Sequence, residues 1–225
     1  IKERLLLFKF RELLLLCYSL FYAYIAKFTG LGSISFNLKK YCKSEGISVQ
    51  KCDDVNSSKF IANINHIEPD FLISISCPQI LRKEIISTPK IACLNMHSTI
   101  LPIHRGVQGI WWTLFEGDKE SGVTIHLINE GVDSGDIIVQ KKVPVRNNPS
   151  QFKLAYLTKR LGFYCTIESV IRMYYDNYNI QYLDKKNGNY NYSPTVDEVK
   201  EFRSRGLNII EIQDLNYILS ANPKF

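Results

Sequence analysis

The sequence predicts an α/β fold in which a largely parallel sheet is flanked by helices. Short apolar runs of strand length alternate with longer stretches whose apolar residues recur at helical spacing. The chain has 225 residues, of which 45% are hydrophobic and 22% are charged, as in ordinary globular proteins. No apolar run reaches the roughly 18 residues that a membrane-spanning helix needs. Disordered, coiled-coil and polytopic membrane proteins are therefore excluded as classes.

The N-terminal segment, residues 1–35, predicts a helix that precedes the main domain. Residues 4–28 are mostly apolar, and Gly30 and Gly32 end the helix. Its apolar stretch has basic flanks but is short for a membrane span and lacks a clear signal-peptide cleavage site. We expect a buried or dimer-interface helix, with peripheral membrane contact through residues 4–28 as the alternative.

The first half of the main domain alternates helix and strand. Gly46 closes one helix, Ser57 or Ser58 caps the next, and Pro69 precedes a buried strand. Strands that alternate with helices at this spacing are typical of parallel sheets. We expect helices over 36–45, 57–66 and 79–86, and strands over 47–51, 71–76 and 90–94.

The second half begins with a loop over 97–106 and a helix over 108–116, which Gly117 ends. Two further strands are joined by residues 129–136, which are rich in turn-forming residues. A long helix follows, and the remainder is irregular apart from one short helix. We expect strands over 123–128 and 137–143, helices over 150–175 and 196–204, a domain over 36–176 and an extension over 177–225.

Charge and cysteine content limit the partners and the compartment. The 28 basic and 22 acidic residues give a net charge of +6 that is spread along the chain. Nucleic-acid binders usually concentrate such charge on one face, so we expect no nucleic-acid partner, while an acidic small molecule is compatible. The six cysteines form no C-x-x-C pair, which predicts no metal site and a reducing, cytoplasmic setting.

Three polar residues are placed where open α/β sheets carry their active sites. Asn95 and His97 follow the strand 90–94, and Asp133 lies in the glycine-rich loop 129–136. An asparagine supplies a neutral donor, a histidine moves protons near neutral pH, and an aspartate can orient that histidine. The set needs no Ser or Cys nucleophile, so it indicates direct acyl transfer to an amine. A loop aspartate that only forms a turn is the alternative.

Three sequence blocks resemble the signature of the folate-dependent formyltransferases. They are residues 95–106 (NMHSTILPIHRG), 122–126 (GVTIH) and 131–138 (GVDSGDII). They occur in the order and with the spacing of that family, which includes glycinamide ribonucleotide, methionyl-tRNA and sugar N-formyltransferases. The resemblance covers roughly residues 47–145 and implies a Rossmann-like formyltransferase fold that binds 10-formyltetrahydrofolate.

The resemblance implies roles for individual residues. Asn95, His97 and Asp133 match the family's catalytic residues. Asn95 and His97 would stabilise the formyl oxygen as the amine attacks, while Asp133 would hold His97 and help to remove the amine proton. The folate would sit between residues 77–81 and the loop 129–136. Its binding residues would be Cys77, Gln79, Ile80, Leu81, Gly131, Val132, Asp133 and Gly135.

The acceptor amine is less clearly encoded. Arg105, Gly106 and Trp112 are similar to an Arg-Gly…Trp pattern of sugar-modifying members, although Gly109 replaces a common proline. About 50 residues follow the long helix, too few for the β-barrel of the tRNA enzymes. We therefore expect a nucleotide-linked amino sugar as acceptor, for lipopolysaccharide or O-antigen synthesis, and a homodimer. The alternatives are a glycinamide ribonucleotide or other small-amine enzyme, a non-catalytic folate- or partner-binding protein, and a tRNA-binding role.

Two other histidines and both tryptophans are expected to have structural roles or to lie at the surface. His104 is expected at the surface beside Arg105, and His126 is expected to be a structural strand residue. Trp111 and Trp112 are expected to be core residues of a helix rather than stacking platforms for a ligand.

Overall fold

The computed structural model describes residue 14, residues 38–147 and residues 149–219. The helix expected over 4–28 therefore lies outside the described residues, apart from Leu14. The chain divides into two compact units, which are described separately. The larger is Cys52–Thr195, and the smaller combines Ile1–Lys51 with Val196–Phe225.

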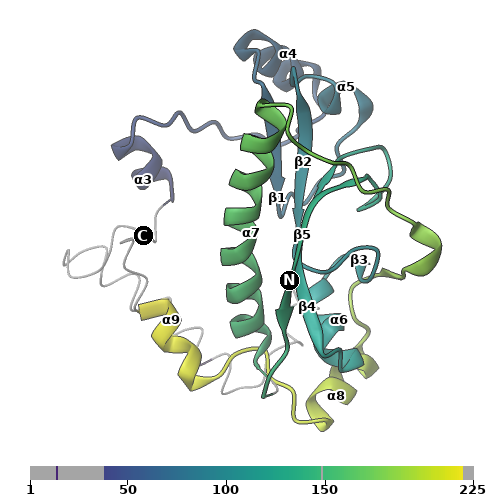
Figure 1. The fold of residues 1–225 in the computed structure, drawn as a ribbon. Coiled ribbons are helices and arrows are strands. Elements are labelled where there is room, and N and C mark those ends of the chain that lie inside the picture. The colour runs from purple at the N-terminus through teal and green to yellow at the C-terminus, as the bar shows by residue number, and fades with distance from the viewer. Residues whose placement is uncertain (1–13, 15–37, 148, 220–225) are drawn as a thin grey trace. The chain divides into compact units, whose positions relative to one another are not determined.

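A four-stranded sheet forms the centre of the larger unit (Figure 1). In order across the sheet, the strands are β1 (Phe71–Ile75), β2 (Ala92–His97), β4 (Glu120–Leu127) and β5 (Ile137–Pro144). β1 and β2 are parallel, whereas β4 is antiparallel to both β2 and β5. The α/β class is confirmed, but the described sheet is mixed rather than largely parallel. A short loop joins β4 to β5 and reverses the chain, and such a connection pairs strands antiparallel.

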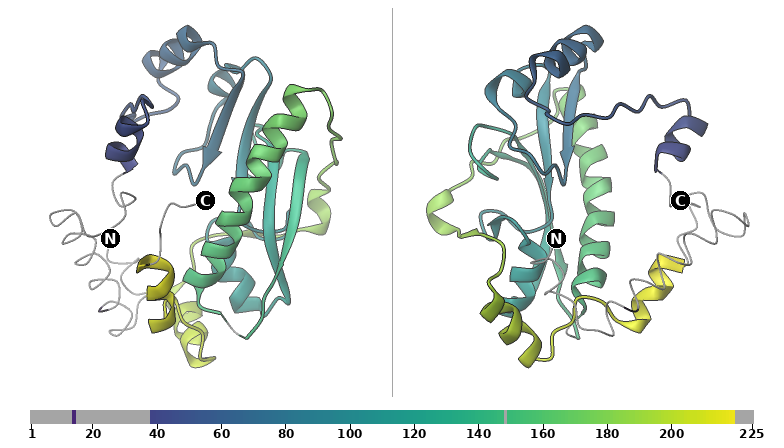
Figure 2. Two further views of the ribbon diagram at one scale, coloured as in Figure 1. Left: turned by 60° about the vertical axis from the view of Figure 1, so that its left-hand side comes forward. Right: turned by 180° about the vertical axis from the view of Figure 1, so that it is seen from behind.

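Helix α7 (Gln151–Tyr174) packs along one face of this sheet, as the two views of Figure 2 show. Ser150 is its N-terminal cap, and its hydroxyl accepts from the N–H of Lys153. Gly162 allows the close approach, because a Cβ there would lie 2.4 Å from Met96 Sδ. Side chains alternate between the faces of a strand, so every second residue of β2 and β4 points to this helix. The resulting core is Ala92, Leu94, Met96, Val123, Ile125, Ile138, Val139, Cys165 and Met173.

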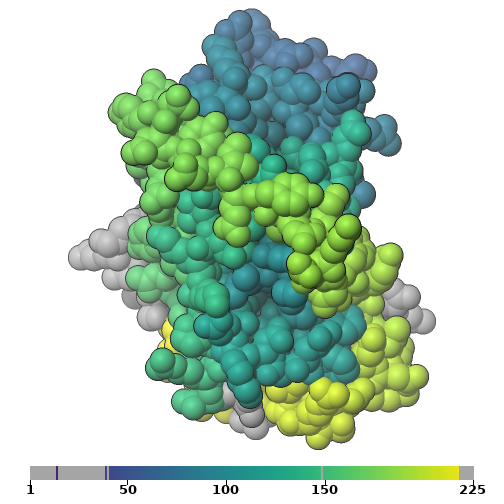
Figure 3. All heavy atoms as spheres, turned by 45° about the vertical axis from the view of Figure 1, so that its right-hand side comes forward, coloured from purple at the N-terminus to yellow at the C-terminus, as the bar shows by residue number. Residues whose placement is uncertain are grey.

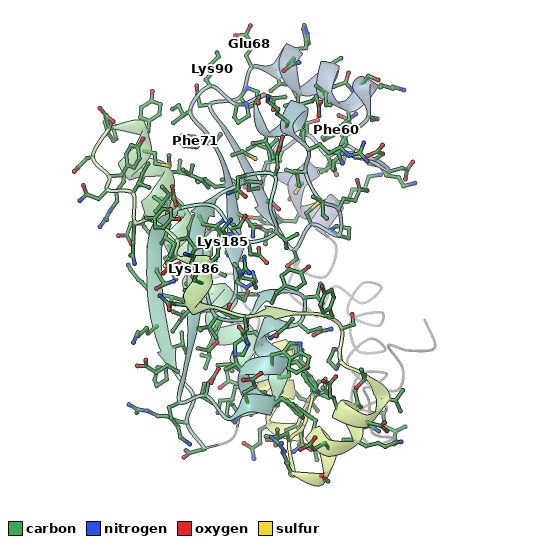
Figure 4. All side chains as sticks on the ribbon, turned by 90° about the vertical axis from the view of Figure 1, so that its right-hand side faces the viewer. Phe60, Glu68, Phe71, Lys90, Lys185 and Lys186 are labelled. Atoms are coloured by element: carbon green, nitrogen blue, oxygen red, sulfur yellow. The ribbon has the colours of Figure 1, made fainter. Side chains whose placement is uncertain are left out.

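The opposite face of β1 and β2 is covered by α4 (Ser58–Ile67) and α5 (Lys83–Ile86). The hydroxyl of Ser57 caps α4 by accepting from the N–H of Phe60 at 3.3 Å. The helix predicted over 79–86 is shorter than expected, since only its last four residues are helical. An exposed ion pair of 3.0 Å joins Lys90 to Glu68 at this end of the unit (Figure 4). Exposed pairs of this kind contribute little stability.

The segment after α7, predicted to be irregular, contains two short elements. They are the 3-10 helix η2 (Lys185–Asn187) and the strand β6 (Tyr190–Asn191). β6 pairs in parallel with β3 (Arg105–Gly106), which lies just before helix α6 (Gly109–Glu116). We call residues 181–192 the strap, because they cross the loop that follows β2 (yellow-green over teal in Figure 3).

The smaller unit contains α3 (Leu38–Ser44), α8 (Val196–Ser204), η3 (Ile212–Asp214) and α9 (Leu215–Leu219). The helices predicted over 36–45 and 196–204 are confirmed. The strand predicted over 47–51 is wrong, since these residues form no strand and the side chains of Ile47 and Val49 are exposed. A strand without a hydrogen-bonded neighbour has no stabilising ladder. Within the described residues, no helix is long and apolar enough to cross a bilayer.

Candidate active site

Strand register places four polar side chains on one face of the sheet. Asn95 of β2 lies opposite His126 of β4, and His97 lies opposite Thr124. Their neighbours in the strands pack against α7, so these four side chains point to the other face. The sequence suggested that Asn95 and His97 lie just beyond the end of the strand. In the structure both are residues of β2 itself.

Asp133 joins this group from the loop between β4 and β5. Its Oδ1 lies 3.2 Å from Asn95 Nδ2, 3.4 Å from His97 Nδ1 and 3.6 Å from His126 Nε2. Its Oδ2 accepts the backbone N–H of Gly106 at 2.8 Å. The carboxylate of Asp133 therefore contacts residues of three strands, β2, β4 and β3.

The carboxyl group of Asp133 is ionised in this setting. Burial alone would raise its pKa, but this effect is outweighed by the contacts with the His126 and His97 side chains, the charge of His97 and the Gly106 N–H. Together they hold the pKa of Asp133 well below its ordinary value. When His97 takes up a second proton on Nδ1, the negative charge of Asp133 can stabilise it.

The hydrogen bonds also assign protons on His126 and Asn95. His126 Nδ1 lies 2.8 Å from the carbonyl oxygen of Leu127, which can only accept, so Nδ1 carries a proton. Nε2 can then accept from Asn95 Nδ2 at 3.1 Å. Because the other hydrogen of that amide points to Asp133, both Asn95 donors are engaged.

His97 is held from two sides. Its Nε2 lies 2.9 Å from the carbonyl oxygen of His104 and must carry the proton. Its Nδ1 faces Asp133 Oδ1, and the residue is 9% exposed. The ring is thus oriented so that Nδ1 is the nitrogen available for proton exchange.

The loop that presents Asp133 is organised by its own side chains and glycines. Asn129 Oδ1 accepts from the N–H of Gly131 at 3.0 Å and from the hydroxyl of Ser134 at 2.6 Å. A Cβ on Gly135 would lie 1.8 Å from the Leu127 carbonyl oxygen. A Cβ on Gly131 would lie 2.2 Å from Ser134 Oγ, so both glycines predicted to bind a cofactor also allow the close packing of this loop. Val132 between them is half-buried.

The segment 77–81 has a structural role that the sequence did not reveal. The Gln79 side chain accepts from the N–H of Val55 at 3.0 Å and donates to the carbonyl of Asp53 at 2.8 Å. Leu81 is a buried core residue. Cys77 packs on the same apolar cluster, whereas the side chain of Ile80 is 64% exposed. Of these predicted cofactor contacts, Cys77 and Ile80 have accessible surface that a ligand could contact. Gln79 holds the segment by hydrogen bonds, and Leu81 holds it by packing in the core.

The three predicted acceptor-binding residues differ in their surroundings. Gly106 contacts Asp133 directly and has φ +92°, and a Cβ there would lie 2.4 Å from the Asn191 carbonyl oxygen. Trp112 Nε1 donates to the carbonyl oxygen of Tyr192 at 3.0 Å and so anchors the strap. Arg105 Nε is buried and has no hydrogen-bond partner within the described residues.

No activated nucleophile lies within the described part of this site. The hydroxyls of Thr99 and Thr124 donate to the backbone carbonyls of Ile103 and Thr99. Burial raises the pKa of the Cys93 thiol to about 12, which keeps it protonated. The described residues also contain no cluster of three or more metal-ligating side chains. The amide of Asn95, the imidazole of His97 and the carboxylate of Asp133 are groups that suit direct transfer between two bound molecules.

One histidine has a different position from that predicted, and another, on its predicted strand, contacts the site. His104 is buried, 2% exposed, and hydrogen-bonded to Asp118, so its assignment to the surface was wrong. His126 contacts both Asn95 and Asp133 and belongs to the site. Its alternation with Val123 and Ile125 along β4 was a readable signal, whereas the burial of His104 depends on the distant strap. Trp111 is fully buried, as predicted for a core residue.

Comparisons of sequence and of structure both match this chain to formyltransferases. Residues 26–164 match the family model described as formyl transferase. The chain is 32% identical over 136 residues to methionyl-tRNA formyltransferase of Thermodesulfovibrio yellowstonii, which covers 60% of this chain and 44% of that protein. It is 37% identical over 130 residues to the enzyme of that name from Prochlorococcus marinus subsp. pastoris, covering 57% and 39%.

Solved structures share the fold. A sugar N-formyltransferase from Shewanella sp FDAARGOS_354 superposes with a TM-score of 0.58 and 24% identity, covering 77% of this chain and 73% of the other. The formyltransferase PseJ from Anoxybacillus kamchatkensis, solved with a UDP-linked formamido sugar and tetrahydrofolate, gives 0.54 and 25%, covering 71% and 82%. The chain spans about half or less of the length of the first curated relatives it matches.

Proposed function

Since this chain belongs to the formyl transferase family, we propose that it transfers a formyl group from 10-formyltetrahydrofolate to a primary amine. The observation that carries the proposal is the convergence of Asn95 and His97 on the ionised carboxylate of Asp133. These groups belong to β2 and to the β4–β5 loop, and they meet without a nucleophile between them.

The residues present fit a formyl-folate donor. The donor supplies an electrophilic carbonyl carbon when it is bound. A carbonyl oxygen needs hydrogen-bond donors, and the site offers the amide of Asn95 and the imidazole of His97. A pterin needs apolar surface, and the half-buried Cys77 and Ile128 lie on one apolar cluster beside the site.

Asn95, His97 and Asp133 have different roles in the proposed transfer. Asn95 donates one amide hydrogen to the formyl oxygen in place of its 3.2 Å contact with Asp133, the longer of its two bonds. His97 keeps a proton on Nε2 and exchanges protons at Nδ1, which faces Asp133 Oδ1. The charge of Asp133 would stabilise the ring after it takes the amine proton at Nδ1, and the ring would then give that proton to the departing folate nitrogen.

We propose a nucleotide-linked amino sugar as the acceptor. The buried Arg105 Nε beside Gly106 lacks a partner within the described residues and suits an anionic group. Lys185 and Lys186 of the strap are exposed and add positive charge (Figure 4). Solved structures of sugar N-formyltransferases share the fold, and PseJ holds a UDP-linked sugar. A role in lipopolysaccharide or O-antigen synthesis follows from this acceptor.

A second candidate acceptor is methionyl-tRNA, because the chain is similar to methionyl-tRNA formyltransferases at 32% and 37% identity. A small amine such as glycinamide ribonucleotide is a third. The homodimer, the cytoplasmic location and peripheral membrane contact stay predictions.

Calorimetric titration with 5-formyltetrahydrofolate, a stable donor analogue, tests the proposal first. We expect micromolar binding that is weakened in Asp133→Asn. Acceptors are then compared by the mass of one added formyl group, using amino-sugar nucleotides, glycinamide ribonucleotide and methionyl-tRNA. Donor binding with formylation of tRNA alone would replace the sugar by the tRNA, and no donor binding would exclude formyl transfer.

A further inference from the structure

His104 is a buried histidine to which the reaction outlined above assigns no role. Its backbone lies in the left-handed region with φ +57°. Residues other than glycine adopt this conformation at a cost, and they retain it where the surrounding structure over-determines it. Contacts around His104 must therefore offset that cost.

Side chains from two other segments clamp His104. Its Nε2 lies 2.7 Å from Asp118 Oδ2, an acceptor, so Nε2 carries the proton. Its Nδ1 then accepts from the side-chain amide of Asn191 at 2.8 Å. Its backbone N–H donates to Asn189 Oδ1 at 2.5 Å. Both the ring and the peptide of His104 are fixed by these bonds.

The remaining polar group of His104 is its carbonyl oxygen, which accepts the Nε2–H of His97 at 2.9 Å. A carbonyl on a clamped residue is a rigid acceptor. It fixes the His97 proton on Nε2 and prevents rotation of the ring, which leaves Nδ1 facing Asp133. Metal-bound histidines are held by outer partners in the same way, and the loss of such partners lowers activity.

We propose that His104, clamped by Asp118 and Asn191, is a positioning residue that sets the tautomer and orientation of His97. The strap supplies half of the clamp, since Asn189 and Asn191 belong to it and Trp112 Nε1 holds its end through Tyr192. The strap lies beyond residues 26–164, which match the family model. It therefore completes the geometry of a site whose catalytic groups all lie within the matched segment.

Asp118 is the residue to change, because its side chain is 36% exposed and touches neither His97 nor Asp133 directly. Asp118→Ala removes the acceptor for His104 Nε2–H, whereas Asp118→Asn keeps an oxygen that can accept it. Glu120→Gln is the matched control, since Glu120 is an acidic residue close to Asp118 in the sequence and forms only an exposed ion pair with Lys142.

The first readout is the tautomer of His97 in the full chain, measured by NMR on protein with nitrogen-15 histidine. His97→Gln identifies the signals. We expect Nε2 to be protonated in the wild type, a mixed tautomer in Asp118→Ala, and wild-type signals in Asp118→Asn and Glu120→Gln. This measurement needs no acceptor, so it reports the position of the His97 ring whatever the substrate is.

The second readout rests on the proposed function. In Asp118→Ala we expect kcat to fall by about tenfold to a hundredfold, the range for a misplaced catalytic group, with an unchanged KM for the folate donor. Asp118→Asn should restore most of the rate. A merely structural role would instead lower the amount of folded protein and leave kcat per folded molecule unchanged.

A folded Asp118→Ala protein with an unaltered His97 tautomer would overturn the positioning role. So would a loss of rate that Asp118→Asn fails to restore. If Asp118→Ala does not fold, Asn191→Ser removes the other half of the clamp and is judged by the same two readouts. An altered tautomer in a protein that formylates no acceptor would overturn the proposed function and support the positioning role.

Discussion

His97 Nδ1 lies 3.4 Å from Asp133 Oδ1, while Nε2 of the same ring is bonded to the His104 carbonyl oxygen. Both ring nitrogens of His97 therefore face oxygen acceptors. The pair is buried, with each side chain 10% exposed, so water competes weakly for these bonds. Proton transfer at His97 therefore depends on how β2 places its ring and on how the β4–β5 loop places Asp133.

Replacing the imidazole should abolish turnover. We expect His97→Ala to reduce kcat/KM for formyl transfer by at least about 100-fold, because it removes a general acid–base group. Steady-state kinetics measure the effect, and circular dichroism checks that the fold persists. His66→Ala is the control, since His66 lies at the exposed end of α4. Near wild-type rates in folded His97→Ala would contradict the mechanism.

The ionised state of Asp133 should appear in the pH dependence of stability. Its pKa is lowered on folding, so its stabilising contribution is complete above the unfolded pKa of about 3.9 and is lost as pH falls below that value. At pH 3 the loss is about 1 kcal/mol. Denaturant unfolding of wild type and Asp133→Asn should show a smaller difference in stability at pH 3 than at pH 5. A difference that grows toward pH 3 would contradict the assigned state.

Gly106 should tolerate no side chain. A Cβ there would meet the Asn191 carbonyl oxygen at 2.4 Å and would also strain φ +92°. We expect Gly106→Ala to destabilise the chain by about 3 kcal/mol and to weaken the hydrogen bond to Asp133. Gly117→Ala is the control, because Gly117 has φ +75° but no atom near a new Cβ, and it should cost about 1 kcal/mol. Thermal unfolding compares the two, and equal losses would exclude the clash.

Arg105 should act on the acceptor and not on the donor. Because its buried Nε has no partner within the described residues, we expect Arg105→Gln to raise KM for an anionic acceptor by about tenfold, the loss of one charge-assisted bond. Binding of 5-formyltetrahydrofolate should be unchanged in calorimetry. Arg172→Gln, which removes an exposed i,i+4 ion pair with Glu168, should alter neither quantity. Weaker donor binding in Arg105→Gln would place Arg105 in the folate site instead.

Cysteine reactivity should follow burial. Burial raises the pKa of Cys93 to about 12 and also raises the pKa of Cys165, so neither forms a thiolate at pH 8. Among the described cysteines, we expect iodoacetamide to label only Cys42, Cys52 and Cys77, which are partly exposed. Peptide mass spectrometry of native and unfolded protein measures this. Rapid labelling of native Cys93 would contradict its place under α4 and α5.

Local signals were enough to predict most helices and strands and to pick out three residues that the fold brings together. Ser57 caps its helix as expected, because capping depends on a few neighbouring residues. The order of the sequence blocks was enough to single out Asn95, His97 and Asp133. The strand over 47–51 was predicted wrongly, since a short apolar run pairs only when a neighbouring strand is present.

Taken alone, the sequence determined the α/β class, the formyl transferase family and the residue types of the site, because periodicity and motif spacing are local properties. Only the tertiary structure decided that the sheet is mixed, that His126 faces Asn95 and that His104 is buried under the strap. These facts depend on strand register and on a segment far along the chain. Proton positions on His97 and His126 likewise follow from carbonyl oxygens that folding brings within hydrogen-bond distance.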